Sequence, residues 1–431
     1  MTYQETITYL YNSAPLFQNI GQGAYKEGLS NTHALDAHFN HPHQSYRTIH
    51  VAGTNGKGSC SHTLASTLQA AGYKVGLYTS PHLVDFRERI RVNGEMVSEQ
   101  FVIDFVAKHR TFFEPLHPSF FELTTAMAFL YFAEQKVDVA VIEVGLGGRL
   151  DCTNIIKPDL SIITNISFDH VGFLGDTLSK IAHEKAGIIK PHTPIIIGEH
   201  NEETYPVFIA EASEKQAPIT FAQETSMITS KESSIDYDIY QTLILNDLQV
   251  ALRGYCQENN VNTLLHAINK LRHIGYNINE DAVRKGFAHV CQSTGLMGRW
   301  QQLNDSPRLI CDTGHNIGGF QYIVPQILAQ PYKQLRIVFG MVNDKDINAV
   351  LALMPQHATY YFTQASVARA LDCKSLQATA VQYNLHGTTY STVAEATRMA
   401  LAEANAEDFI YVGGSSFIVA DLLVEWERIK N

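Results

Sequence analysis

The sequence predicts an α/β fold, with a mostly parallel sheet in a larger N-terminal domain and a smaller, Rossmann-like α/β domain after it. Three observations support this prediction. Short β-branched runs alternate with helical patterns along most of the chain, as in parallel sheets covered by helices. Many of these runs are nearly continuous in apolar residues, which is typical of strands buried on both faces. Polar or Gly-rich turns follow the runs directly.

The first part of the chain supplies most of the predicted elements. Each strand candidate is rich in Val, Ile or other apolar residues and ends at a turn. We expect strands at Arg47–Val51, Lys74–Thr79, Val137–Val144, Leu160–Ile166 and Pro194–Ile197. We expect helices from Ser59 to Ala71, at Thr124–Gln135 and at Leu178–Ile189.

The pattern changes between Asn201 and Leu252, where alternating stretches such as Ile235–Leu245 predict antiparallel strands.

Because Gly295–Gly298 contains two glycines, we expect a hinge there and two domains, residues 1–297 and 298–431. The second domain is again an alternating block. Its predicted strands are Arg308–Cys311, Leu335–Phe339, Thr359–Thr363 and Phe409–Val412, and its predicted helices include Thr392–Ala404 and Phe417–Ile429.

The composition is that of a globular protein and argues against several functional classes. The 431 residues carry a formal net charge of −11, which opposes non-specific binding to nucleic acid. The apolar runs fall short of the ~18 residues of a membrane span, and Met1–Leu10 lacks the basic segment of a secretory signal. Because the six cysteines show no CxxC spacing, we expect reduced thiols in a cytoplasmic protein.

A Gly-rich turn follows the first predicted strand and opens a predicted helix. Its glycines let the backbone N–H groups approach phosphate oxygens, and the helix N-terminus adds partial positive charge. We therefore expect a P-loop-type mononucleotide-binding domain, with Lys57 reaching the β- and γ-phosphates. Gly58 separates Lys57 from Ser59, so the spacing differs from the common Walker loop, and a turn with an exposed lysine is the alternative. The expected binding residues are Thr54, Asn55, Gly56, Lys57, Gly58 and Ser59.

Further motifs follow in a fixed order. They are Tyr78–Leu83, Phe86–Ile90, Glu143–Asp151, Thr153-Asn154, Asp169-His170, Leu174-Gly175, Ile181–Ile188, Gly298-Arg299, Asp312–Asn316, Phe339-Gly340, Asp344–Asp346 and Gly414-Ser415. On these motifs the chain resembles the folylpolyglutamate synthase/dihydrofolate synthase family of the Mur ligase superfamily. The Ser-Pro-His-Leu and Phe-Arg-Glu-Arg-Ile blocks favour the folate branch over the cell-wall branch.

The resemblance implies a magnesium site. Glu143 ends an apolar strand, where α/β folds bind ligands, and a carboxylate there suits Mg²⁺. By resemblance, Ser80 and Glu143 hold the ion that bridges the ATP phosphates, and His170 is a ligand of a second Mg²⁺. Taken alone, each residue is more simply structural, and imidazole is an unusual magnesium ligand.

Lys185 lies among apolar residues of a predicted helix. Burial lowers a lysine pKa, and a neutral amine reacts with CO₂ to form a carbamate, which binds metal as a carboxylate does. The resemblance implies this modification, and a salt bridge to an acid or phosphate is the alternative. The expected catalytic residues are then Lys57, Glu143, His170 and Lys185.

The resemblance also assigns contacts to the nucleotide and to glutamate. Asn260 is similar to the family's adenine-side asparagine, and Arg299 and Asp312 to nucleotide contacts from the second domain. His315 and Ser415 resemble residues that receive glutamate. Without the resemblance, Asp312 is an acid at a strand end and Ser415 a helix N-cap.

The chain departs from the family pattern at a few positions. Thr313-Gly314 replaces the usual Gly-Ala, Met297 stands where a proline often precedes Gly-Arg, and Asp421 replaces a common glutamate. These changes concern the expected glutamate pocket rather than the ATP and metal site. We assign no role to Gly21–His43.

The resemblance implies ATP-dependent amide ligation of glutamate to dihydropteroate, a folate, or both, through an acyl phosphate. ATP between the two domains is expected to draw them together and exclude water. The expected partners are these small molecules, without nucleic acid or membrane, and the expected state is a monomer. The alternatives are a cell-wall ligase with a UDP-linked acceptor, a P-loop ATPase switch and a non-catalytic nucleotide-binding module.

Overall fold

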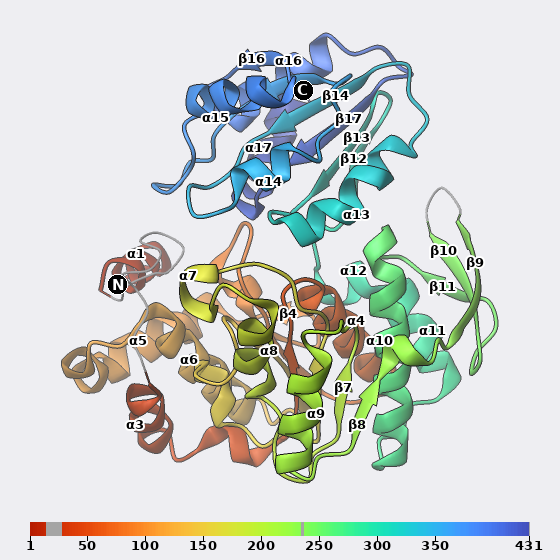
Figure 1. Cartoon of the computed structure of the whole chain (residues 1–431). Coiled ribbons are helices and arrows are strands. Elements are labelled where there is room, and N and C mark those ends of the chain that lie inside the picture. The colour runs from red at the N-terminus through yellow and green to blue at the C-terminus, as the bar shows by residue number, and fades with distance from the viewer. Residues whose placement is uncertain (14–27, 234–236, 431) are drawn as a thin grey trace. The chain divides into compact units, whose positions relative to one another are not determined.

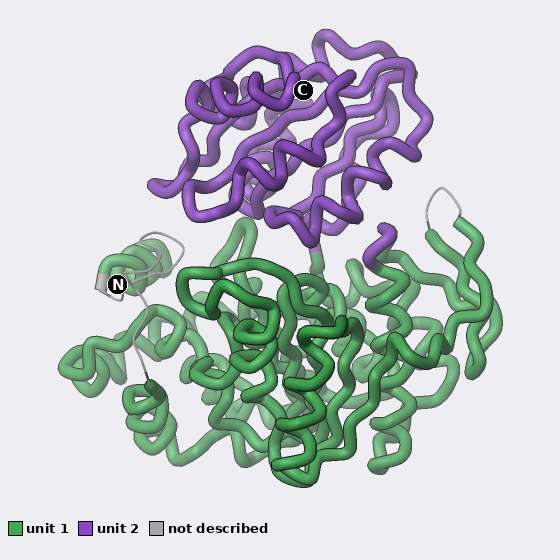
Figure 2. Tube along the Cα trace, viewed as in Figure 1, with its two compact units in different colours: residues 1–252, 257–296 green, residues 253–256, 297–431 purple. Residues whose placement is uncertain are grey.

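The computed structural model of the chain describes residues 1–13, 28–233 and 237–430, which form two α/β units (Figures 1 and 2). Unit 1 comprises Met1–Leu252 and Gln257–Leu296, and unit 2 comprises Arg253–Cys256 and Met297–Asn431. Each unit has a sheet of its own.

The main sheet of unit 1 has the strand order β4-β3-β2-β5-β1-β6-β7-β8. Strands β2, β5, β1, β6, β7 and β8 pair in parallel, whereas β3 and β4 form an antiparallel edge. The bounds are β1 (Arg47–Ala52), β2 (Val75–Tyr78), β3 (Ile90–Val92), β4 (Glu95–Met96), β5 (Val139–Glu143), β6 (Leu160–Ile163), β7 (Ile195–Ile197) and β8 (Ile219–Phe221).

Both faces of this sheet are buried, because successive side chains of a strand point to opposite faces. In β5, Val139 and Val141 pack in the same hydrophobic cluster as Leu64, which lies in the helix that follows β1. Ala140 and Ile142 pack in a different cluster, on the other face. Continuous apolar strands are therefore confirmed as strands that bury both faces.

Helices cover the two faces in separate layers (Figure 1). Residues of α4, α10 and α11 pack on one face, and residues of α5, α6, α8 and α9 on the other. The helices of this part of the chain are α1 (Tyr3–Ser13), α3 (Ser30–His38), α4 (Lys57–Ala70), α5 (Glu99–Phe113), α6 (Phe120–Glu134), α7 (Val171–Leu174), α8 (Leu178–Ala186), α9 (Tyr205–Glu214), α10 (Tyr255–His273), α11 (Glu280–Ala288) and α12 (Val290–Thr294).

The stretch predicted to hold antiparallel strands forms a small separate sheet with the order β11-β10-β9. Its strands are β9 (Ile228–Ser233), β10 (Asp238–Thr242) and β11 (Leu248–Val250), and both pairings are antiparallel. This confirms the antiparallel prediction for the described part of Ile235–Leu245. Residues 235 and 236 lie outside the described residues, as do residues 21–27 of the Gly21–His43 segment.

Unit 2 contains a sheet with the order β12-β13-β17-β14-β15-β16, parallel except for the edge strand β12. Aromatic and aliphatic side chains of β13, β14 and β15 pack with α13, α14 and α15, while α16 and α17 also pack on the strands. The elements are β12 (Gln301–Asp305), β13 (Arg308–Asp312), β14 (Leu335–Phe339), β15 (Thr359–Phe362), β16 (Gly387–Thr389), β17 (Phe409–Gly413), α13 (Ile317–Leu328), α14 (Ile347–Leu351), α15 (Cys373–Ala380), α16 (Val393–Ala402) and α17 (Ser416–Ile429).

Two predicted elements end three residues earlier than expected. The strand predicted at Leu160–Ile166 ends at Ile163, and the side chains of Thr164 and Asn165 that follow bond with the loop after β1. The helix predicted at Leu178–Ile189 ends at Ala186, followed by Gly187 as its C-cap. The long helices α5 and α10 were not among the predicted elements.

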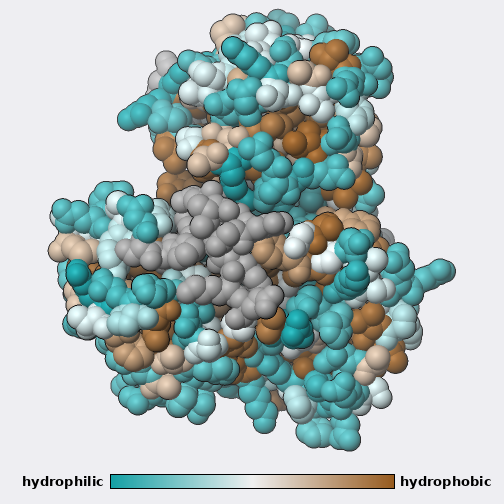
Figure 3. Space-filling view, turned by 60° about the vertical axis from the view of Figure 1, so that its left-hand side comes forward, coloured by the Kyte–Doolittle hydropathy of each residue, from teal (hydrophilic) through white to brown (hydrophobic). Residues whose placement is uncertain are grey.

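The surface in Figure 3 carries mainly hydrophilic side chains with apolar ones between them. Within the described ranges, no helix combines the length and apolarity that crossing a bilayer requires. All six cysteines lie in these ranges and are free, as predicted.

Candidate active site

The Gly-rich turn lies between β1 and α4, at the carboxyl end of the central strand of the parallel sheet. Two of its residues need the conformational freedom of glycine, since Gly53 has φ 146° and Gly56 has φ 82°. A Cβ atom at Gly53 would overlap the Thr164 hydroxyl, and one at Gly56 would overlap the Asn260 carboxamide. Gly56 is also the N-cap of α4, so the loop directs a helix N-terminus at this edge, as anion sites do.

Two lysines lie beside this loop. The Nζ atom of Lys57 donates to the carbonyls of Gly53 and Thr54, each over 3.1 Å. The Nζ atom of Lys185, from α8, donates to the carbonyl of Gly53 over 2.9 Å. Burial, followed by the charge of Lys57, lowers the pKa of Lys185 to about 7. The Lys185 amine can thus be neutral near pH 7, as its apolar neighbours in the sequence predicted.

The segment that follows β6 holds the loop in place. The amide of Thr54 donates to the carbonyl of Asn165 over 2.9 Å. The Thr54 hydroxyl donates to the Ser167 carbonyl over 3.1 Å and accepts from the Ser167 amide over 3.0 Å. The Thr164 hydroxyl donates to the carbonyl of Asn55. These partners were not predicted, although polar residues directly after a buried strand were a signal for them.

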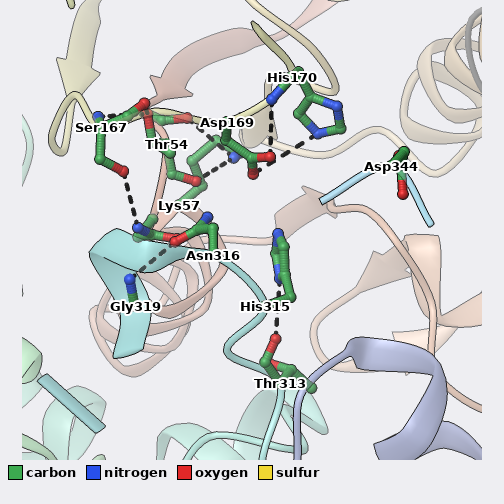
Figure 4. A network of polar contacts seen from close by, with 12 residues as sticks. Thr54, Lys57, Ser167, Asp169, His170, Thr313, His315, Asn316, Gly319 and Asp344 are labelled. Carbon is green, nitrogen blue, oxygen red and sulfur yellow. Dashed lines mark hydrogen bonds and ion pairs between the residues drawn. The ribbon is translucent and has the colours of Figure 1, made fainter. Parts of the chain in front are cut away.

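Asp169 and His170 continue from this segment, so the chain places the predicted His170 site close to the loop (Figure 4). His170 has φ 50° and is the N-cap of α7. Its amide donates to Asp169 over 2.9 Å, and its Nε2 atom lies 3.9 Å from the same carboxylate. The ring of His170 therefore has an acidic neighbour, Asp169, with which it forms one of the sequence motifs.

Glu143 and Ser80 lie at the ends of neighbouring parallel strands. Tyr78 of β2 pairs in register with Ile142 of β5, so Ser80 and Glu143 follow at the same edge of the sheet. Glu143 is only 3% exposed. Among the described residues, no group of three or more His, Cys, Asp or Glu side chains could hold a metal ion. The predicted ligand set contains only two residues of these types, together with a serine and a lysine.

Asn260 reaches the phosphate loop from α10. Its Nδ2 atom donates to the Gln257 carboxamide over 2.9 Å, and Gln257 donates to the Ser59 hydroxyl over 3.3 Å. Asn260 also contacts Gly56, as described above. The structure thus brings Asn260 next to the loop although more than 200 residues separate it from Gly56.

In unit 2, the predicted nucleotide contacts lie side by side. Asp312 ends β13 and accepts from the amides of Trp300 and Gly314, each over 2.8 Å. Arg299 donates to the Thr313 hydroxyl. Burial raises the pKa of Asp312, while the charge of Arg299 opposes the shift. Arg299 and Asp312 therefore form one charged site at the end of β13.

His315 and Ser415 follow strands that are also neighbours. Asp312 of β13 pairs in register with Gly413 of β17, so both residues lie just past the same edge. The Nδ1 atom of His315 lies 3.1 Å from the carbonyl of Thr313. The Ser415 hydroxyl accepts from the Ile418 amide over 3.2 Å, which makes Ser415 the N-cap of α17, the structural role that the sequence left open.

Known proteins resemble this chain along most of its length. A model of the Mur ligase middle domain matches residues 51–268, and a model of the Mur ligase glutamate ligase domain matches residues 298–416. A dihydrofolate synthase/folylpolyglutamate synthase of Escherichia coli is 35% identical over 375 residues, covering 86% of this chain and 85% of that protein. A probable bifunctional folylpolyglutamate synthase/dihydropteroate synthase of Haloferax volcanii is 29% identical over 99% of this chain. The chain spans about half of that relative's length (51%).

Solved structures agree with these matches. Escherichia coli FolC in complex with DHPP and ADP superposes with a TM-score of 0.85 at 30% identity, covering 100% of this chain and 99% of that one. The Yersinia pestis bifunctional folylpolyglutamate synthase/dihydrofolate synthase, complexed with AMPPNP and a Mn ion, gives 0.81 at 27% identity, covering 99% and 98%. With the loop geometry and the two matched domains, these similarities show that the chain belongs to the Mur ligase family, in its folylpolyglutamate synthase/dihydrofolate synthase branch.

Proposed function

We propose that the chain is an ATP-dependent amide ligase that joins L-glutamate to dihydropteroate, a folate, or both. The observation that carries this proposal is the phosphate loop Gly53–Ser59, with Lys57 and Lys185 beside it, in a chain of this family. The E. coli relative's structure holds DHPP and ADP, which fits an acceptor of this class and a nucleotide product. We assign ATP binding to residues 1–297 and glutamate binding to residues 298–431.

The nucleotide contacts follow from the loop. The N–H groups of Gly56 and of the first turn of α4 would bind the β- and γ-phosphates, since the amides before them donate to Asn165. Lys57 would stabilise charge on the transferring phosphoryl group. Asn260 would contact the adenine side. Arg299 and Asp312 would supply the second domain's contacts to the nucleotide.

The donor set fits a magnesium ion. Glu143 and Ser80 offer hard oxygen donors from neighbouring strand ends, and His170 would contribute to a second ion. Lys185 fits only as a carbamate, which its lowered pKa favours. Bound magnesium would neutralise charge on the phosphates. The Mn ion and AMPPNP in the Yersinia relative support a divalent ion with ATP, and two Mg²⁺ ions are our proposal.

The reaction needs an activated carboxylate, because oxide is a poor leaving group. Transfer of the γ-phosphoryl group to the acceptor carboxylate gives an acyl phosphate and ADP. The α-amine of glutamate then attacks the acyl carbon, and the tetrahedral intermediate expels phosphate to leave an amide. We assign the orientation of glutamate to His315 and Ser415. Exclusion of water would protect the acyl phosphate from hydrolysis.

Release of ADP by the purified chain tests this proposal, with ATP, Mg²⁺ and glutamate and with dihydropteroate or tetrahydrofolate in separate reactions. We expect ADP, phosphate and a new amide only when both glutamate and one acceptor are present. Turnover with both acceptors would assign both reactions. Turnover with a UDP-linked cell-wall acceptor instead, or ATP hydrolysis that needs neither acceptor nor glutamate, would overturn the proposal. We also propose that the protein is a cytoplasmic monomer. Size-exclusion chromatography with light scattering measures its oligomeric state.

A further inference from the structure

A chain of hydrogen bonds crosses the ends of three adjacent parallel strands in unit 1. The strands are β1, β6 and β7, which are neighbours in the sheet. The Oδ1 atom of Asn165 accepts from the backbone amide of Asn55 in the phosphate loop over 2.9 Å. Its Nδ2 atom donates to the carboxylate of Glu199 over 3.2 Å. Asn165 therefore links the loop after β1 to the residue that follows β7.

The two ends of this chain are held by the sheet. The amide of Glu199 donates to the carbonyl of Thr164 over 2.9 Å, and that of Gly198 donates to Ile163 over 2.8 Å. The carbonyl of Asn165 accepts from the amide of Thr54 over 2.9 Å. The backbones of Glu199 and Asn165 are thus fixed next to β6, so a change of partners would involve the side chains rather than the backbone.

The carboxylate of Glu199 decides which way the Asn165 amide faces. A carboxylate is an acceptor only, so it requires the NH₂ group of Asn165. The oxygen of Asn165 must then face the opposite side, where the amide of Asn55 needs an acceptor. With a partner at 199 that could also donate, both orientations of the Asn165 amide would be possible, and one of them places two N–H donors against each other.

This arrangement matters for phosphate binding because it fixes one amide of the loop. The Asn55 amide points to Asn165, while Gly56 with φ 82° is the N-cap of α4. The amides that follow are then left to face an anion at the helix N-terminus. We propose that Asn165 is a positioning residue for the phosphate loop and that Glu199 sets the orientation of its side-chain amide. The inference rests on the proposed function for its nucleotide ligand.

Four variants of the full chain test the inference, with two readouts. The first readout is the Kd for AMPPNP with Mg²⁺, measured by calorimetry without acceptor or glutamate. The second is the KM for ATP against the KM for glutamate. The variants are Asn165→Ala, Asn165→Asp, the double variant Asn165→Asp with Glu199→Gln, and the control Asn279→Ala, which removes a side-chain oxygen that accepts from the Ala282 amide over 2.8 Å.

We expect Asn165→Ala to weaken AMPPNP binding by about tenfold, the effect of one lost hydrogen bond, with the KM for glutamate unchanged within about twofold. Asn165→Asp should weaken binding further, since two carboxylates then face each other. Adding Glu199→Gln should recover part of that loss, because the glutamine amide can donate to Asp at 165. Asn279→Ala should leave the Kd for AMPPNP unchanged.

Unchanged AMPPNP binding by Asn165→Ala, or failure of Glu199→Gln to recover any binding in the Asn165→Asp background, would overturn the inference. If Asn165→Ala does not fold, the comparison of Asn165→Asp with the double variant still decides. Because AMPPNP binding needs neither acceptor nor glutamate, normal binding without ligase turnover would reject the proposed reaction and leave the inference standing. Absence of AMPPNP binding by the unaltered chain would reject both.

Discussion

Lys57 and Lys185 converge on one oxygen atom, since the Nζ atoms of both donate to the carbonyl of Gly53, over 3.1 and 2.9 Å. One lysine starts α4 and the other lies in α8. Two ammonium groups this close repel each other, and the buried one loses its proton more readily. This explains why the charge of Lys57 is, after burial, the next cause of the lowered pKa of Lys185.

Replacing Lys57 with Met should therefore raise the pKa of Lys185 above about 7. At a fixed pH near 7 a smaller fraction of its amine is then neutral and able to bind CO₂. Carbon-13 NMR of the carbamate formed from labelled bicarbonate measures this as a function of pH. Lys185→Met identifies the signal, and Lys190→Met is a control, because burial also lowers the pKa of that lysine, to about 8. An unshifted titration of the Lys185 carbamate in Lys57→Met would contradict the prediction.

The two glycines that flank α4 provide a matched pair. Gly56 and Gly72 have φ values of 82° and 92°, but a Cβ atom at Gly72 has open space, whereas one at Gly56 overlaps Asn260. We expect each change to Ala to cost at least about 1 kcal/mol of unfolding free energy because of the positive φ. Only Gly56→Ala should also weaken AMPPNP binding, by more than about tenfold, since Asn260 and the loop must separate. Equal AMPPNP affinities for Gly56→Ala and Gly72→Ala would show that the contact with Asn260 is unimportant.

Asp312→Asn should destabilise unit 2. The carboxylate accepts from two backbone amides, whereas Asn offers one oxygen and turns an NH₂ group to the second N–H. We expect a loss of about 1–3 kcal/mol in urea unfolding monitored by fluorescence of Trp300 and Trp426. Asp305→Asn is the control, because Asp305 is exposed at the end of β12. A loss no larger than that of the control would refute the prediction.

His50 should make stability depend on acid pH. Burial lowers its pKa from the ordinary 6.5 to about 3, so below pH 6.5 the unfolded chain takes up a proton that the folded chain refuses. Stability should then fall as pH drops from about 6.5 to 3, at roughly 1.4 kcal/mol per pH unit from this residue. His50→Gln should lose this part of the slope in urea titrations, whereas His273→Gln, at an exposed position, should keep it. A slope unchanged by His50→Gln would reject the assignment.

Much of the fold could be predicted because each strand is marked by its own run of apolar residues. All residues of Val137–Val144 except Asp138 and Glu143 are apolar, and β5 lies within this run. The end of β6 was misjudged because Ile166 extends the apolar run. In the structure the side chains of Thr164 and Asn165, just past the end of β6, bond with the phosphate loop instead.

The candidate site likewise has residues that a local sequence pattern predicts and residues that it does not. Lys57 and the glycines of the loop are contiguous in sequence, so a local pattern was enough to find them. Asn165 and Glu199 reach that loop only because β6 and β7 are the next strands beside β1, and strand order is not written in any single segment. The roles of His170, Lys185, His315 and Ser415 as ligand or substrate contacts remain predictions from family resemblance.

The connector between the two units at the predicted hinge, Gly295–Gly298, is short. The amide of Gly295 donates to Cys291 at the end of α12, and the amide of Gly298 donates to the side chain of Gln301 in β12. Only Leu296 and Met297 lie between these two anchored glycines. A connector of two residues keeps two folded bodies at a high effective concentration, whatever their arrangement. Inserting glycines after Leu296 would lengthen this connector and leave the chain crossings on either side of Arg253–Cys256 as the remaining short ties between the units, with both sheets intact.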